Sequence, residues 1–284
     1  MWVGVIEKPA DYQIILNLRM EDLSKYKHVM FEAAEEAAKI QLQYFNTEIE
    51  IGRKRDYNDL VTEVDKKCEA RIIEIINSYF PEHNLLGEEG GDLNKKSDYV
   101  WIVDPIDGTV NYAHAVPIYC VSIALEIKGE IVLGIVYSAM THEKFWAEMG
   151  KGAYLNDKKI AVSDIEFLKD GLLVTGFPYG SKENMDHCID HFVNFIRMGL
   201  PIRRLGSAAM DICYLACGRF DGFWEVNLNA WDVAAGYLIL NEAGGKLTDF
   251  KGGVYSIYSK QILATNGNTI HKEMIEILEK AYLA

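Results

Sequence analysis

The spacing of apolar residues predicts two long helices near the N-terminus. Across residues 24–45, apolar side chains recur every three or four positions, which is the spacing of one helix face. The same spacing returns across residues 65–79. Both segments also carry many charged residues, so each helix is expected to be amphipathic and to pack one face on a core.

Strands are predicted next, followed by an alternation of strands and helices. Runs rich in β-branched and aromatic residues cover 99–103, 120–127, 131–137 and 144–148, with a hairpin turn at Lys128 and Gly129. These runs predict an antiparallel sheet. From about residue 163, strands at 172–175, 202–205, 223–226 and 263–265 alternate with helices at 187–198, 208–217, 232–243 and 270–282. Such alternation is typical of an α/β unit.

Composition narrows the class of protein without identifying it. The chain has 284 residues, of which 49% are hydrophobic and 25% charged. It is therefore long and apolar enough to bury the hydrophobic core of an ordinary enzyme. Its net charge of −13 argues against binding to the phosphate backbone of nucleic acids. No apolar run reaches membrane-spanning length and no secretory signal is recognisable, so we expect a cytoplasmic protein. The five cysteines are odd in number and widely spaced in the sequence, which indicates reduced thiols rather than a set of disulfides.

The segment Asp104-Pro105-Ile106-Asp107-Gly108-Thr109 is the first candidate for chemistry. It follows a predicted buried strand that should end at Val103. Gly108 permits a tight turn that directs Asp104 and Asp107 to one point and leaves the Ile106 carbonyl free. Oxygen ligands without nearby Cys or His suit Mg²⁺ and disfavour zinc. Taken alone, the segment fits a simple turn at a strand end equally well.

Three further segments carry acidic residues in a loop or at the start of a helix, where they too could bind a cation. Glu88 and Glu89 lie in a glycine-rich loop, Asp232 begins an apolar helical run, and Asp65 lies where another helix is expected to begin. Each has an ordinary explanation when taken singly. Paired glutamates in a loop are usually solvated, and an aspartate in a first helical turn complements the helix dipole.

Together these motifs resemble those of the inositol monophosphatase family of metal-dependent sugar phosphatases. The resemblance extends from about Leu23 to the C-terminus and rests on Gly87-Glu88-Glu89, Asp104 to Thr109, Trp231-Asp232-Val233-Ala234-Ala235-Gly236, Leu60 to Asp65, and Gly206-Ser207-Ala208-Ala209. It implies an α+β and α/β fold, a layered αβαβα sandwich of the sugar phosphatase type. Residues 1–22 would be an N-terminal extension. Residues 23–162 would form the half with the antiparallel sheet and most metal ligands, and residues 163–284 the half with the substrate contacts.

The resemblance implies two or three Mg²⁺ ions and assigns roles to the acids. Asp104 would bridge two ions, Glu88 and the Ile106 carbonyl would complete one site, and Asp107 and Asp232 the other. Glu89 would either support the ligands without contacting an ion or serve a weaker third ion. The catalytic group would comprise Glu88 and a hydrogen-bonded pair, Thr109 and Asp65, that takes a proton from the attacking water. The implied substrate contacts are Asp107, Gly108, Thr109, Gly206, Ser207, Ala208, Glu225 and one of Arg203 and Arg204.

Arg203 or Arg204 could meet a second phosphate of the substrate, or could form a salt bridge at a strand end. The implied reaction is Mg²⁺-dependent hydrolysis of a small sugar or polyol phosphate, with inositol 1-phosphate as the leading substrate. Fructose-1,6-bisphosphatase and 3′-phosphonucleotide phosphatase activities share the same motifs and stay open. The resemblance also implies lithium sensitivity and a homodimer. The acidic charge and the lack of a membrane-spanning run predict no direct nucleic acid partner and no membrane partner.

Two other classes of protein are alternatives to this family. In a haloacid-dehalogenase-type phosphatase a second acid follows the nucleophilic Asp by two residues, whereas Asp107 follows Asp104 by three, so that route is disfavoured. A binding partner of the transcription machinery is the alternative outside enzymes, because some bacterial relatives with the Gly206-Ser207-Ala208-Ala209 pattern are thought to act in that way.

Overall fold

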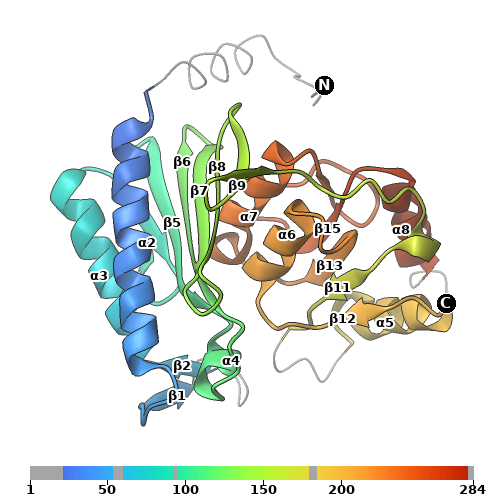
Figure 1. The fold of residues 1–284 in the computed structure, drawn as a ribbon, viewed down its shortest axis with the longest axis horizontal. Helices are drawn as coiled ribbons and strands as arrows, with labels where there is room; N and C mark the ends of the chain where they lie inside the picture. Colours follow the sequence, from blue (N-terminus) through green and yellow to red (C-terminus); the bar gives the residue numbers. More distant parts are fainter. Residues whose placement is uncertain (1–21, 54–59, 93–94, 179–183, 281–284) are drawn as a thin grey trace.

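Five layers of helices and sheets make up the chain in the computed structural model, which describes residues 22–53, 60–92, 95–178 and 184–280 (Figure 1). Helices α2 and α3 cover the outer face of a large sheet, α6 and α7 lie between this sheet and a smaller one, and α5 and α8 cover the far side. This arrangement confirms the αβαβα sandwich. The helices are α2 (Ser24–Tyr44), α3 (Glu63–Tyr79), α4 (Thr109–Ala113), α5 (Cys188–Arg197), α6 (Ala208–Ala216), α7 (Ala230–Glu242) and α8 (Thr269–Lys280).

The large sheet has eight strands in the order β10-β9-β8-β7-β6-β5-β3-β4. All its pairs are antiparallel except β3 with β5, so the sheet is mixed at one edge. The predicted hairpin turn at Lys128 and Gly129 joins β6 to β7. The strands are β3 (Asn84–Gly87), β4 (Gly91–Asp92), β5 (Tyr99–Asp107), β6 (Cys120–Ile127), β7 (Glu130–Ser138), β8 (Glu143–Glu148), β9 (Gly152–Leu155) and β10 (Lys158–Ile160).

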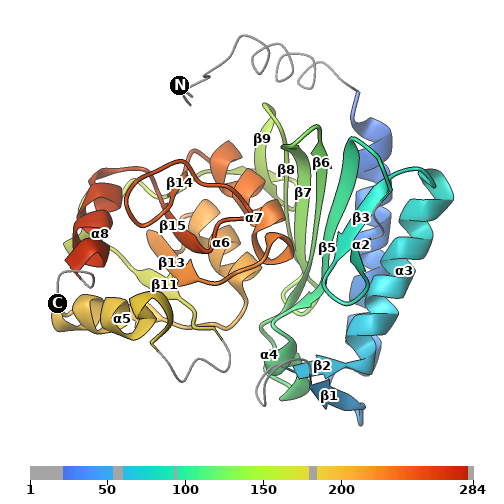
Figure 2. The ribbon, with the colours of Figure 1, turned by 180° about the vertical axis from the view of Figure 1, so that it is seen from behind.

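The small sheet has five strands in the order β12-β11-β13-β15-β14, and Figure 2 shows it between the α6/α7 layer and the α5/α8 layer. Strand β11 pairs in parallel with β12 and β13, whereas β15 is antiparallel to β13 and β14. A separate pair, β1 (Ile51–Arg53) and β2 (Leu60–Thr62), precedes α3. The small sheet consists of β11 (Leu173–Thr175), β12 (Ile202–Arg203), β13 (Gly222–Val226), β14 (Lys246–Thr248) and β15 (Gln261–Thr265).

Helix α7 packs directly on the large sheet because the contact uses small residues. A Cβ atom at Gly134 of β7 would lie 3.0 Å from the Cα of Ala235, and one at Gly236 would lie 3.0 Å from Ile212 of α6. Helix α7 therefore packs closely against both β7 and α6. Because α7 lies between two sheets, it is apolar on nearly every side rather than amphipathic. Its N-terminus, with Asp232, is fixed beside the end of β5.

Two predicted boundaries near the acids are wrong. Strand β5 does not end at Val103 but continues to Asp107, and its register against β6 shifts between Asp104 and Asp107. A β-bulge of this kind accommodates Pro105, which has no N–H to donate to the ladder. Helix α7 begins at Ala230, two residues early, because Asn229 caps it and Asp232 occupies the third helical position of a capping box.

Other expectations concern the ends and the cysteines. The predicted extension, residues 1–22, lies outside the described residues except for Asp22. All five cysteines are free, and Cys217 is only partly buried because it caps the C-terminus of α6. In the described part of the chain, no helix has the length and apolar character needed to cross a membrane.

Candidate functional site

A cavity of about 420 Å³ lies where the large sheet, α6, α7 and β13 meet. Glu88, Asp104 and Thr109 line it from the large-sheet half, and Glu225 and Asp232 line it from the other half. The volume falls within the roughly 300–1,000 Å³ typical of small-molecule sites. The fold thus joins acidic segments that are more than 120 residues apart in the sequence.

Three aspartates form the centre of this cavity. Asp104 and Asp107 come from the bulged end of β5 and Asp232 from the first turn of α7, and one carboxylate oxygen of each lies within 4.8 Å of the others. At an effective dielectric constant of about 20, two unit charges at such a distance repel by roughly 3 kcal/mol. A backbone N–H group holds each of them in place: Ile106 donates to Asp104 (3.0 Å), Asn229 to Asp232 (2.7 Å) and Ala209 to Asp107 (2.7 Å). This set of oxygen ligands fits a hard divalent cation.

Glu88 and Glu89 are separated by the fold although they are adjacent in sequence. The N–H of Glu88 donates to the carbonyl of Val103 at 3.2 Å, which places its half-buried side chain on the cavity wall beside Asp104. Glu89 does not line the cavity. Its N–H donates to the carboxylate of Glu69 at 2.9 Å, and its charge helps to raise the pKa of Asp65.

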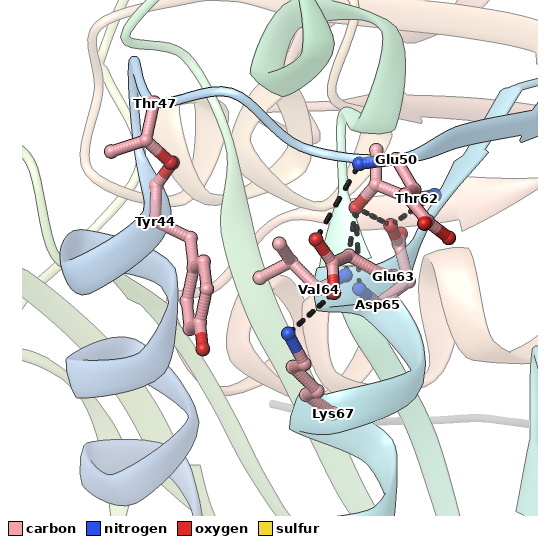
Figure 3. A network of polar contacts seen from close by, with 8 residues as sticks. All are labelled: Tyr44, Thr47, Glu50, Thr62, Glu63, Val64, Asp65 and Lys67. Carbon is pink, nitrogen blue, oxygen red and sulfur yellow. Dashed lines mark hydrogen bonds and ion pairs between the residues drawn. The ribbon is translucent and has the colours of Figure 1, made fainter.

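Thr109 and Asp65 are hydrogen-bonded, as the resemblance implied. The hydroxyl group of Thr109 lies 3.0 Å from Oδ1 of Asp65 and 3.0 Å from the carbonyl oxygen of Ile106. The other oxygen of Asp65 accepts from the N–H (2.8 Å) and hydroxyl group (2.5 Å) of Thr62, which forms the capping box of α3 (Figure 3). Burial is the main cause that raises the pKa of Asp65 above its usual value.

The glycine turn before α4 and the start of α6 converge on Asp107. Gly108 has a φ of 98°, and a Cβ atom there would lie 2.9 Å from the carbonyl oxygen of Ile118, so only glycine suits the position. Oδ2 of Asp107 accepts hydrogen bonds from the hydroxyl group of Ser207 (2.6 Å) and the N–H of Ala209 (2.7 Å). Burial raises the pKa of Asp107. The hydroxyl group of Ser207 is thus already engaged by Asp107, although Gly206, Ser207 and Ala208 all line the cavity.

The two arginines differ in position. Arg204 lines the cavity, with its guanidinium carbon 5.7 Å from the centre of the Phe177 ring. Arg203 is exposed, donates to the carbonyl of Ile202 and does not line the cavity. Glu225, at the end of β13, is buried on the wall, and this burial together with the charges of Asp232 and Asp107 raises its pKa to about 8.

Comparison with known proteins agrees with this geometry. Residues 22–282 match the model of the inositol monophosphatase family. The chain belongs to this family. It is accordingly a phosphatase that hydrolyses phosphoric monoesters, and the carboxylate cluster is consistent with a metal-dependent member.

Individual proteins resemble between about three quarters and nine tenths of the chain. An inositol-1-monophosphatase from Synechocystis is 39% identical over 258 residues, which is 90% of each chain. The Nus factor SuhB of Pasteurella multocida is 43% identical over 208 residues, 73% of this chain and 78% of that protein. A solved IMPase/NADP phosphatase complexed with Mg²⁺ and phosphate is 25% identical with a TM-score of 0.79, and the match covers 90% of this chain and 96% of that one.

The structure adds cavity residues to those that the family resemblance implied. Asp211, Gly176 and Lys260 also line the cavity. Asp211 follows Ser207 by one helical turn, and it interrupts an otherwise apolar run in α6. That interruption was the available signal, because an acid on the buried face of a short helix needs a local reason.

Proposed function

We propose that this chain hydrolyses a small sugar or polyol phosphate monoester in a reaction that requires Mg²⁺, with inositol 1-phosphate as the leading substrate. The observation that carries the proposal is the meeting of three aspartate oxygens within 4.8 Å on the wall of a cavity that also holds the Thr109–Asp65 pair. A phosphate monoester carries nearly two negative charges, and acids alone would repel it. Bound divalent cations would neutralise the acids and turn this repulsion of the phosphate into attraction.

Two Mg²⁺ ions would be held by these oxygen ligands. Glu88, Asp104 and the carbonyl of Ile106 would hold one ion, and Asp104, Asp107 and Asp232 would hold the other. When bound, the ions would polarise the phosphoryl group and lower the pKa of a coordinated water. Glu89 does not line the cavity, so any third ion that it helps to hold would be a weaker one.

Proton transfer is assigned to Thr109 and Asp65. The hydroxyl group of Thr109 lies at the cavity surface, and Oδ1 of Asp65 is 3.0 Å behind it. A water proton can move to the Thr109 oxygen while the hydroxyl proton moves to Asp65. A threonine hydroxyl alone is too weak a base, so the buried carboxylate is the acceptor that makes this transfer favourable.

Fructose 1,6-bisphosphate is the second candidate substrate, and the position of Arg204 supports it. A guanidinium group on the cavity wall can form a charge-assisted hydrogen bond with a second phosphate. Phe177 and Trp231 are the aromatic residues of the cavity lining among the described residues, and the lining is mainly polar. Because a polar wall suits the hydroxyl groups of a polyol better than the faces of a base, we rank a 3′-phosphonucleotide third.

Phosphate release from purified protein tests the proposed function. With Mg²⁺, we expect the highest catalytic efficiency on inositol 1-phosphate, a lower one on fructose 1,6-bisphosphate and the lowest on 3′-phosphoadenosine 5′-phosphate. A chelator should abolish all three activities because the acids then lack a counter-charge. Activity that survives chelation would contradict the metal mechanism. A reversed order of substrates would overturn the substrate class.

Lithium inhibition is a further expected result. A small monovalent cation that replaces the ion held by Asp107 and Asp232 supplies half the charge, so it would retain phosphate without supporting the next turnover. Lithium chloride should therefore inhibit at concentrations at which sodium chloride at equal ionic strength has little effect. Equal responses to the two salts would count against this arrangement of ligands.

A role as a partner of the transcription machinery is the alternative from another class, and the similarity to a Nus factor SuhB supports it. A protein that releases no phosphate from any monoester yet binds purified RNA polymerase would favour this role. The homodimer stays a prediction drawn from the family resemblance, and the cytoplasmic location stays a prediction drawn from the pattern of apolar residues.

A further inference from the structure

Asp211 of α6 is a buried carboxyl group that the proposed mechanism does not use. Its side chain is 1% exposed, and Oδ1 has no hydrogen-bond partner within the described residues, yet the residue lines the cavity. Burial, with the nearby charges of Glu225 and Asp107, raises its pKa well above the usual value. A buried polar atom without a partner lowers stability, so its presence here needs an explanation.

The neighbours of Asp211 show which part of the cavity it serves. Glu225 lies against the backbone of Gly176 so closely that a Cβ atom there would be 2.2 Å from Oε2 of Glu225. Gly176 thus leaves room for this carboxylate on the wall. Arg204 carries the positive charge that acts on both acids. We call Asp211, Glu225, Gly176 and Arg204 the acceptor wall.

The acceptor wall favours one kind of ligand group. Two carboxyl groups offer several acceptor oxygens, of which Oδ1 of Asp211 is unsatisfied. A second anion on these acids would be repelled, and an ammonium group would meet the charge of Arg204. Neutral hydroxyl groups donate hydrogen bonds without either cost. The phosphoryl end of the substrate would be held separately, by the Mg²⁺ ions that Asp104, Asp107 and Asp232 would bind.

We propose that Asp211 extends the substrate position that the family resemblance gives to Glu225, and that it forms a hydrogen bond with a further hydroxyl group of a polyol substrate. The inference rests on the proposed function, because it assumes that the phosphate end binds at the aspartate cluster. Asp211 is then a specificity-determining residue. Its unpartnered oxygen is satisfied only when a substrate with hydroxyl groups is bound, so its contribution depends on the substrate.

The test compares Asp211→Ala with wild type on two substrates, inositol 1-phosphate and p-nitrophenyl phosphate, whose leaving group carries no further hydroxyl group. Alanine removes both carboxyl oxygens without placing a new group in the cavity. We expect kcat/KM on inositol 1-phosphate to fall about tenfold or more, and kcat/KM on p-nitrophenyl phosphate to change less than about twofold. The melting temperature should stay the same or rise, because Ala removes a buried carboxyl group with an unpartnered oxygen and favours the helix. Asp164→Ala, at an exposed position outside the cavity, is the control and should change neither the two kcat/KM values nor the melting temperature.

Each other outcome overturns the subsite. Equal losses on both substrates, with a lower melting temperature, would show that Asp211 is structural. No loss on either substrate would show that solvent alone satisfies its carboxyl group. Wild-type protein that releases phosphate from neither substrate would overturn the proposed function and the subsite with it, and this failure is visible before any variant is made.

Discussion

Replacing Asp104 or Asp232 by asparagine is expected to reduce Mg²⁺-dependent phosphate release about a hundredfold or more while the protein stays folded. Each residue supplies one of the three oxygens that meet within 4.8 Å. Loss of a charge weakens both ion binding and the neutralisation of the substrate. The amide oxygen of Asn can still accept the N–H of Ile106 or Asn229, so the local backbone should be retained.

Activity assays and thermal melts on the same samples check this expectation. Asp157→Asn, an exposed residue between β9 and β10, is the matched control and should behave as wild type. The melting temperatures of the two cluster variants should not fall in the absence of Mg²⁺, because each removes a charge that its neighbours repel. Near-normal turnover in either folded variant would refute the two-ion assignment.

The elements that the sequence predicted well are those with a strong local pattern. Helices α2 and α3 have one buried face each, and their bounds agree with the prediction to within two residues. Strand β3 was missed because its four residues show no alternation beyond Leu85 and Leu86. The continuation of β5 through Pro105 could not be predicted, since it depends on pairing with β6 across a bulge.

The sequence predicts the site residues that belong to short local motifs. It does not predict which of two adjacent residues lines the cavity. Arg203 and Arg204 are adjacent, yet Arg203 is the last residue of β12 and only Arg204, just beyond the strand, lines the cavity. Glu88 and Glu89 diverge in the turn after β3: Glu88 lines the cavity, and Glu89 donates its N–H to Glu69. Asp211 is a different case: its importance follows from the burial of α6 between two sheets, which no short motif records.

Removing the hydroxyl group of Thr109 is the second change with a large expected effect. Thr109→Val keeps the shape of the side chain and leaves the Thr62–Asp65 capping box intact, but it removes the hydroxyl group that lies 3.0 Å from Oδ1 of Asp65. General-base assistance contributes about 10²–10⁴-fold to comparable reactions, so we expect kcat to fall by about a hundredfold or more. Thr109→Ser retains the hydroxyl group and should keep most of the activity.

The serine and valine variants together separate catalysis from capping. A purely structural Thr109 would lower the melting temperature in Thr109→Val without a matching loss of kcat. If Thr109 relays the proton, kcat falls while KM changes little, because the aspartate cluster still binds the phosphate end. Asp65→Asn is less informative, since Asp65 also accepts two hydrogen bonds from Thr62 and its loss weakens the start of α3. Equal kcat values for the valine and serine variants would therefore place the base elsewhere in the cavity.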